Sequence, residues 1–219
     1  MPSTVILDVN ETLSDLTPVA DALAALGLPR EAATTWLAAT LRDGFALSLT
    51  TGARPFAEVA EQALTGLLAA EPNLRGPVQD GVDQVMAVFA ALPVHPDVID
   101  GLRALALAGH HLVTLSNGSS EYARDLLERA GAADAIEAFL SVEAVDAWKP
   151  HRSTYEHALA RLSVTAADAA LVAVHPWDLH GARAAGLVTV HLDRDGAPWP
   201  SVLTPPDHCV RTLTELELP

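Results

Sequence analysis

The chain has 219 residues, a formal net charge of −15 and a single cysteine, Cys209, and half of its residues are apolar. So acidic a protein is a poor partner for nucleic acid or an anionic membrane, although one pocket in it can still bind a small anion. A lone cysteine excludes a disulfide framework and a cysteine metal cluster, and it indicates a cytoplasmic protein. Because the N-terminus enters an apolar strand pattern at once, we expect no signal peptide and no membrane span.

The first predicted element is a buried strand that runs into Asp8. Val5, Ile6 and Leu7 precede this carboxylate, and turn-prone and hydroxyl residues follow it. A short apolar run rich in β-branched residues is typical of a parallel sheet, whose ligands bind outside the carboxyl ends of the strands. Asp8 is therefore a candidate functional residue; the alternative is that it only ends the strand.

The next eighty residues show helical periodicity throughout. Apolar residues recur at spacings of three and four, and turn-prone residues separate the helical stretches. The predicted helices cover residues 18–26, 31–49, 55–68 and 78–92. We expect this segment to form a helical cap domain over residues 15–92, inserted into a core domain of residues 1–14 and 93–219.

From residue 96 onward, helices alternate with short apolar strands. This alternation predicts an α/β fold with a doubly wound parallel sheet. After the last core strand we expect only a Pro-rich loop and a short tail. The predicted helices cover residues 97–108, 121–130, 154–162 and 179–185, and the predicted strands cover residues 111–115, 139–142, 170–174 and 188–191.

Polar residues recur at four strand ends or in the loops nearby. They are Asp8 with Thr12, Ser116 with Asn117, Lys149, and Asp178. In a doubly wound sheet such places can converge on one crevice. Each has an ordinary alternative, namely a turn, a solvated lysine or an aspartate favoured at a helix N-terminus. Their joint occurrence in this order favours a single site.

These motifs resemble those of the haloacid dehalogenase superfamily, and within it the type II 2-haloacid dehalogenases. The resemblance covers nearly the whole chain and implies a Rossmann-like core with a helical cap. It rests on the segment Asp8-Val9-Asn10-Glu11-Thr12-Leu13, on Leu115-Ser116-Asn117-Gly118-Ser119, on Trp148-Lys149-Pro150 with Tyr155, and on Trp177-Asp178 with Gly181-Ala182.

The resemblance implies a role for each matching residue. Asp8 would be the nucleophile that forms an ester with the substrate, and Ser116 and Lys149 would hold its carboxylate. Thr12 and Asn117 would position the substrate. Tyr155 would join the same polar network, and Asp178 would orient Lys149 or assist the water that hydrolyses the ester.

Two positions separate this chain from the phosphatases of the superfamily. Asn10 stands where phosphatases carry their acid, and Val174 stands where they carry one of two acidic magnesium ligands. An alkoxide leaves poorly without an acid, whereas a halide departs as an anion. We therefore expect no metal and no cofactor; magnesium would be needed only if the phosphatase alternative held. Asn10 becomes a substrate-binding candidate.

The chain also departs from the dehalogenase pattern. Ala173 and His175 replace a serine and an asparagine, and an alignment through Trp36 places Leu47 where the substrate-binding arginine belongs. His175 would be a base or, as we prefer, a hydrogen-bonding replacement for the asparagine that helps to bind the substrate. Trp177 is a further substrate-binding candidate. Two arginines could replace the missing one, Arg54 and, as our preferred candidate, Arg42.

Together these residues predict a hydrolase that removes halogen from small 2-haloalkanoic acids through an aspartyl ester. A phosphatase with an altered acid and a binding protein on an inactive scaffold are the alternatives. The expected partner is a small anionic organic substrate, with no nucleic acid and no membrane; a homodimer is left open.

Overall fold

The computed structural model describes residues 2–218, which divide into two compact units. Residues 2–14 and 93–218 form one of them, the α/β unit, and Asp15–Leu92 form the other, the helical unit. The expected fold class is confirmed, because the α/β unit is built on one parallel sheet and every regular element of the helical unit is a helix.

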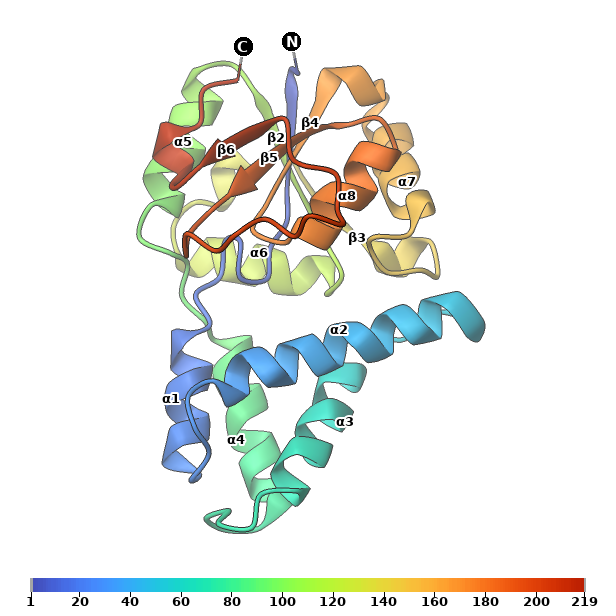
Figure 1. The fold of residues 1–219 in the computed structure, drawn as a ribbon. Coiled ribbons are helices and arrows are strands. Elements are labelled where there is room, and N and C mark those ends of the chain that lie inside the picture. The colour runs from blue at the N-terminus through green and yellow to red at the C-terminus, as the bar shows by residue number, and fades with distance from the viewer. Residues whose placement is uncertain (1, 219) are drawn as a thin grey trace. The chain divides into compact units, whose positions relative to one another are not determined.

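The sheet of the α/β unit has six parallel strands in the order β3-β2-β1-β4-β5-β6 (Figure 1). All residues of the two central strands β1 and β4 are buried, as a parallel sheet covered on both faces requires. Their sequences, TVIL and AALVA, are accordingly short and largely apolar. The strands are β1 (Thr4–Leu7), β2 (His111–Ser116), β3 (Ala138–Ser141), β4 (Ala169–Ala173), β5 (Val188–Leu192) and β6 (His208–Val210).

Helices cover both faces of this sheet. Helices α5 (Val98–Leu107) and α6 (Ser120–Arg129) pack on one face, and α7 (Arg152–Leu162) and α8 (Pro176–Ala184) pack on the other (Figure 1). Local signals begin two of them: the side chain of Ser119 accepts a hydrogen bond from the N–H of Tyr122 at the start of α6, and α8 starts with proline. Four short 3₁₀ helices complete the unit, η1 (Ala133–Ala135), η2 (Val142–Ala144), η3 (Ala166–Asp168) and η4 (Leu213–Glu215).

The strand order makes β1 and β4 the topological switch point of the sheet. From β1 the chain continues to β2 and β3 on one side, and β4, β5 and β6 extend the sheet on the other. Ligands of doubly wound proteins bind at the carboxyl ends of strands at such a point. Asp8 directly follows β1, and its N–H donates to the carbonyl of Val172 in β4 at 3.0 Å. This register fixes Asp8 at the switch point.

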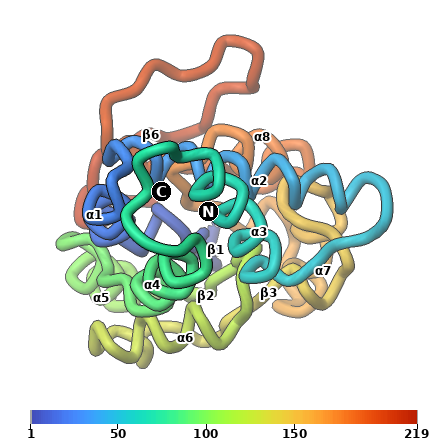
Figure 2. Tube along the Cα trace, turned by 90° about the horizontal axis from the view of Figure 1, so that it is seen from below, coloured from blue at the N-terminus to red at the C-terminus, as the bar shows by residue number. Residues whose placement is uncertain are grey.

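The C-terminal segment differs from the expected short tail. Residues 208–210 form β6, which pairs in parallel with β5 at the edge of the sheet. Figure 2 shows the segment between these strands, in red-orange, as a long loop that leaves the sheet. The strand β6 has only three residues, which is too few to show a period of two in the sequence. Its pairing with the backbone of β5 is what makes it a strand.

The helical unit consists of four helices that share an apolar core. Trp36 is fully buried, and its indole N–H donates to the carbonyl of Ala60 at 2.8 Å. Its ring meets Phe89 edge-on at 5.4 Å, and Phe56 stacks on Phe89 at 5.8 Å. The helices are α1 (Thr17–Ala25), α2 (Ala32–Thr50), α3 (Phe56–Ala69) and α4 (Val78–Ala90), within a residue or two of the expected bounds.

Candidate active site

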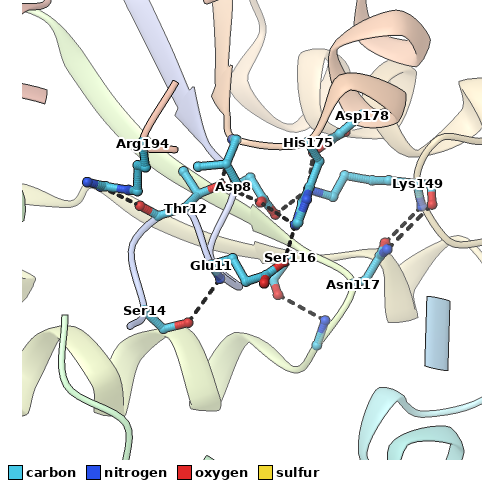
Figure 3. A network of polar contacts seen from close by, with 12 residues as sticks. Asp8, Glu11, Thr12, Ser14, Ser116, Asn117, Lys149, His175, Asp178 and Arg194 are labelled. Carbon is cyan, nitrogen blue, oxygen red and sulfur yellow. Dashed lines mark hydrogen bonds and ion pairs between the residues drawn. The ribbon is translucent and has the colours of Figure 1, made fainter. Parts of the chain in front are cut away.

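Asp8 and Lys149 form the centre of a buried polar cluster in the α/β unit (Figure 3). The ammonium Nζ of Lys149 lies 2.8 Å from Oδ1 of Asp8 and 2.7 Å from Oδ2 of Asp178. Lys149 and Asp178 have no exposed surface, and Asp8 is 4% exposed. One buried cation is thus shared by two carboxylates, an arrangement that is tolerated away from water only when each charge is paired.

The carboxyl groups of Asp8 and Asp178 share this cation but have pKa values shifted in opposite directions. Burial by itself would raise the pKa of Asp8, but the Lys149 ammonium and His175 outweigh burial and hold it below its usual range. For Asp178 burial dominates over Lys149, and the pKa is raised. Burial would lower the pKa of Lys149, yet Asp178 and Asp8 together raise it. The cluster therefore favours a charged Lys149 and an ionised Asp8.

Thr12 fixes the second oxygen of Asp8. Its hydroxyl donates to Oδ2 of Asp8 at 2.7 Å and accepts the N–H of Val174 at 3.1 Å. Oδ1 and Oδ2 of Asp8 thus each accept from a different side chain, Oδ1 from Lys149 and Oδ2 from Thr12. The carboxylate is held at both ends, and Thr12 connects it to the residue after β4.

Tyr155 extends the cluster by hydrogen bonding to Asp178. Its phenol donates to Oδ1 of Asp178 at 2.6 Å and to the Asp178 carbonyl at 3.0 Å. Burial and the neighbouring Asp178 raise the pKa of Tyr155 well above its usual value, so the phenol keeps its proton. Since Lys149 occupies the other oxygen, Asp178 has both oxygens engaged. Its expected task, orienting Lys149 or assisting the water, stays a prediction.

Ser116 and Asn117 stabilise loops in the site. The hydroxyl of Ser116 accepts the N–H of Gly118 at 2.9 Å; the bonds made by the described residues include none from Ser116 to Asp8. The amide of Asn117 accepts the N–H of Lys149 at 2.8 Å and donates to its carbonyl at 3.4 Å. Asn117 thereby anchors the main chain of Lys149, and its substrate contact stays a prediction.

His175 and Glu11 form a second polar pair beside Asp8. Nε2 of His175 lies 3.6 Å from a carboxylate oxygen of Glu11 and 3.8 Å from Oδ2 of Asp8, and its ring stacks on Trp177 at 5.0 Å. Burial, only partly offset by His175, raises the pKa of Glu11. Sequence reasoning missed Glu11 as a site residue; its position three residues after Asp8, combined with an unusual histidine at 175, was the available signal.

Three further candidates lie at different places. Asn10 is buried, and its Oδ1 has no hydrogen-bond partner among the described residues. Arg42 pairs with the adjacent Asp43 in α2, and Arg54 pairs with Glu58, both within the helical unit. The substrate-binding roles of Asn10 and Arg42 stay predictions. Within residues 2–218, no group of three or more His, Cys, Asp or Glu side chains is arranged to hold a metal ion.

A parallel α/β sheet with a lysine-paired aspartate at its switch point defines the class of this protein. Residues 2–186 match the model of the haloacid dehalogenase-like hydrolases, and the chain belongs to that family. This bears out the resemblance carried by the sequence motifs.

None of the helices in the described part of the chain has the length and apolar character needed to cross a membrane.

Several 2-haloacid dehalogenases are similar to this chain. (S)-2-haloacid dehalogenase 1 of Pseudomonas sp. (strain CBS-3) is 31% identical over 61% of this chain and 59% of its own length. The (S)-2-haloacid dehalogenase of Xanthobacter autotrophicus is 28% identical over 89% of this chain and 76% of its own. The first curated relatives are thus matched over less than two thirds of their length, at 59%, 58% and 56%.

Solved structures of dehalogenases share the fold over almost the whole chain. A dehalogenase with an intermediate complex superimposes with a TM-score of 0.91 at 26% identity, covering 98% of this chain and 95% of that one. The L-2-haloacid dehalogenase of Xanthobacter autotrophicus gives a TM-score of 0.86 at 25% identity, with 98% and 96% covered.

Proposed function

We propose that this chain hydrolyses the carbon–halogen bond of small 2-haloalkanoic acids, with Asp8 as the nucleophile. One observation carries the proposal: a buried, ionised carboxylate at the sheet's switch point has one oxygen on Lys149 and the other on Thr12. The names of the similar proteins supply the substrate class, and those named for one enantiomer act on the (S) form.

In the first half-reaction, an oxygen of Asp8 attacks C2 of the substrate. The new C–O bond forms as the C–X bond breaks, and the halide leaves with the bonding electron pair. No acid is required, because halide is a stable anion; this accommodates Asn10 in place of an acid. Lys149 keeps Asp8 ionised before attack, and the fixed carboxylate needs little reorganisation to reach the carbon.

In the second half-reaction, water hydrolyses the ester at the carboxyl carbon of Asp8. The products are the 2-hydroxy acid and the regenerated carboxylate. We assign the proton of this water to His175, with Glu11 balancing the charge that the ring gains. The protonated ring then returns this proton to the alkoxide oxygen as the bond between that oxygen and the Asp8 carboxyl carbon breaks. Separations of 3.6 and 3.8 Å are too long for direct hydrogen bonds and suit a bridging water. Asp178 is a weaker candidate, because Lys149 and Tyr155 occupy its oxygens.

A halide-release screen tests the proposal. The purified chain is incubated with 2-chloropropionate and 2-bromopropionate, as separate enantiomers, and with chloroacetate and p-nitrophenyl phosphate, each with and without magnesium. We expect halide release from the (S)-2-halo acids without magnesium. Phosphate release that depends on magnesium would replace this function with the phosphatase, and no turnover of any substrate by the folded protein would favour a binding role.

A further inference from the structure

The loop that follows Asp8 is held by its carbonyl groups. Nε2 of His95 lies 3.0 Å from the carbonyl oxygen of Glu11. The backbone N–H of His95 donates to the carbonyl oxygen of Leu13 at 2.9 Å. Between them, Nη2 of Arg194 donates to the carbonyl of Thr12 at 2.8 Å (Figure 3). Glu11 has a φ of 59°, an uncommon conformation for a non-glycine residue. Such a backbone persists only where its surroundings enforce it.

Arg194 is itself held by Asp97, and Asp97 is bonded to the C-terminal part of the chain through Leu213. Its Nη1 pairs with Oδ1 of Asp97 at 2.8 Å, and Oδ2 of Asp97 accepts the N–H of Leu213 at 2.7 Å. Burial would raise the pKa of Asp97, but the Leu213 N–H and the guanidinium outweigh it and lower that pKa, so the carboxylate stays charged. A Cβ added to Gly101 would lie 2.3 Å from Cβ of Leu213, which shows how closely α5 meets this anchor.

These contacts form a continuous path to the nucleophile. Arg194 binds the main chain of Thr12, and the side chain of Thr12 binds Oδ2 of Asp8. Arg194 is only 14% exposed, and its Nε has no hydrogen-bond partner among the described residues. Burying a guanidinium with one N–H unpaired costs free energy. The bonds from Nη1 to Asp97 and from Nη2 to the Thr12 carbonyl offset this cost. Arg194 also lies beyond residues 2–186, the region that the family model matches.

We propose that Arg194 is a positioning residue: braced by Asp97, it holds the Thr12 carbonyl so that the Thr12 hydroxyl aims Asp8 at the substrate carbon. The inference rests on the proposed function for its effect on rate. It predicts that the C-terminal segment sets the geometry of the attack without contacting the substrate.

A double-mutant cycle tests this path. The rate of ester formation is measured in single turnovers for Arg194→Met, Thr12→Val and the double variant. Loss of the brace should reduce ester formation about 10- to 100-fold with little change in KM, the size expected for a misplaced reacting group. The double variant should be no slower than Thr12→Val, because both changes break one path. Losses that multiply in the double variant would overturn the proposal.

Two further variants separate positioning from folding. Arg194→Lys keeps the charge beside Asp97 but cannot place two amino groups separately; it should fold and show a smaller rate loss. Arg183→Met is the matched control, because it breaks the Arg183–Asp207 ion pair elsewhere in the α/β unit. We expect this control to retain the wild-type rate. An equal loss in the control would mean that any broken arginine pair slows the protein, and would contradict the proposal.

Hydrogen exchange gives a readout that needs no turnover. The N–H groups of Leu13 and Ser14 both donate to the carbonyl of Val9 and close the loop. Arg194→Met and Arg194→Lys should lose protection in the peptide covering residues 9–14, whereas Arg183→Met should not. Unchanged exchange in both Arg194 variants would refute the brace. If the wild-type chain released no halide, the proposed function would fail while this measurement still decided the role of Arg194.

Discussion

Nζ of Lys149 lies 2.8 Å from Oδ1 of Asp8, although 141 positions separate the two residues in the chain. The same ammonium contacts Asp178, so two carboxylates depend on one cation for their charge balance. All three side chains are buried.

Asp8→Asn should abolish turnover without unfolding the protein, since it keeps the shape of the side chain and removes its charge. In a single turnover of the wild-type chain in ¹⁸O water, the label should enter Asp8, and the first product should carry an unlabelled protein oxygen. Mass spectrometry of the protein and the product measures both. Label found directly in the product, with Asp8 unlabelled, would mean that water attacks the substrate itself. Full activity of Asp8→Asn, after deamidation is excluded, would contradict the assignment.

Lys149→Met should destabilise the fold by about 3–5 kcal/mol, because it leaves two buried carboxylates without their cation. Urea unfolding followed by circular dichroism measures the change. Arg152→Met serves as the control: Arg152 forms an exposed ion pair with Glu156, and its loss should alter the unfolding free energy by no more than about 0.5 kcal/mol. Equal effects of the two variants would show that Lys149 carries no special charge balance.

The pH dependence of stability follows from the lowered pKa of Asp8. An aspartate more acidic in the folded state stabilises the protein above its unfolded pKa, and this stability is lost as the pH falls through the folded value. The unfolding free energy of the wild type should therefore fall more steeply than that of Asp8→Asn as the pH drops below about 4. Urea titrations at a series of acidic pH values measure both curves. Parallel curves would mean that Lys149 does not favour the ionised Asp8 in the folded protein.

His175→Gln should slow hydrolysis of the ester more than its formation, because the glutamine can hold a water but cannot take its proton. The esterified protein should then accumulate, as a mass increase measured on intact protein after mixing with substrate. His111→Gln, which changes an exposed histidine paired with Glu137, is the control and should accumulate no ester. Slower ester formation without accumulation would instead give His175 a role in binding or attack.

Chelation should leave halide release unchanged. Val174 removes one oxygen ligand of the magnesium-dependent relatives, and Asn10 removes the acid that a phosphate ester requires. Initial rates with and without EDTA, followed by magnesium addition, measure the effect. Loss of activity with EDTA and its recovery with magnesium would contradict the dehalogenase function and favour the phosphatase alternative.

The sequence by itself determined the fold class and the set of polar residues at the strand ends. Short apolar runs between helical stretches are typical of strands buried on both faces, and Asp8, Lys149 and Asp178 stand where such strands or their loops present side chains to a crevice. Both signals are local: a few consecutive residues carry each of them.

Only the tertiary structure decided which atoms meet. In it, the amide of Asn117 accepts the backbone N–H of Lys149, and Glu11 lies beside His175. The guanidinium of Arg194 donates to the carbonyl of Thr12. The tertiary structure also added β6 at the sheet edge. Contacts between residues far apart in the chain depend on register and on loop geometry, and no periodicity in the sequence reports either. A buried charge is moreover stable only beside a partner, so each of these partners has to be supplied by a residue that the fold brings close.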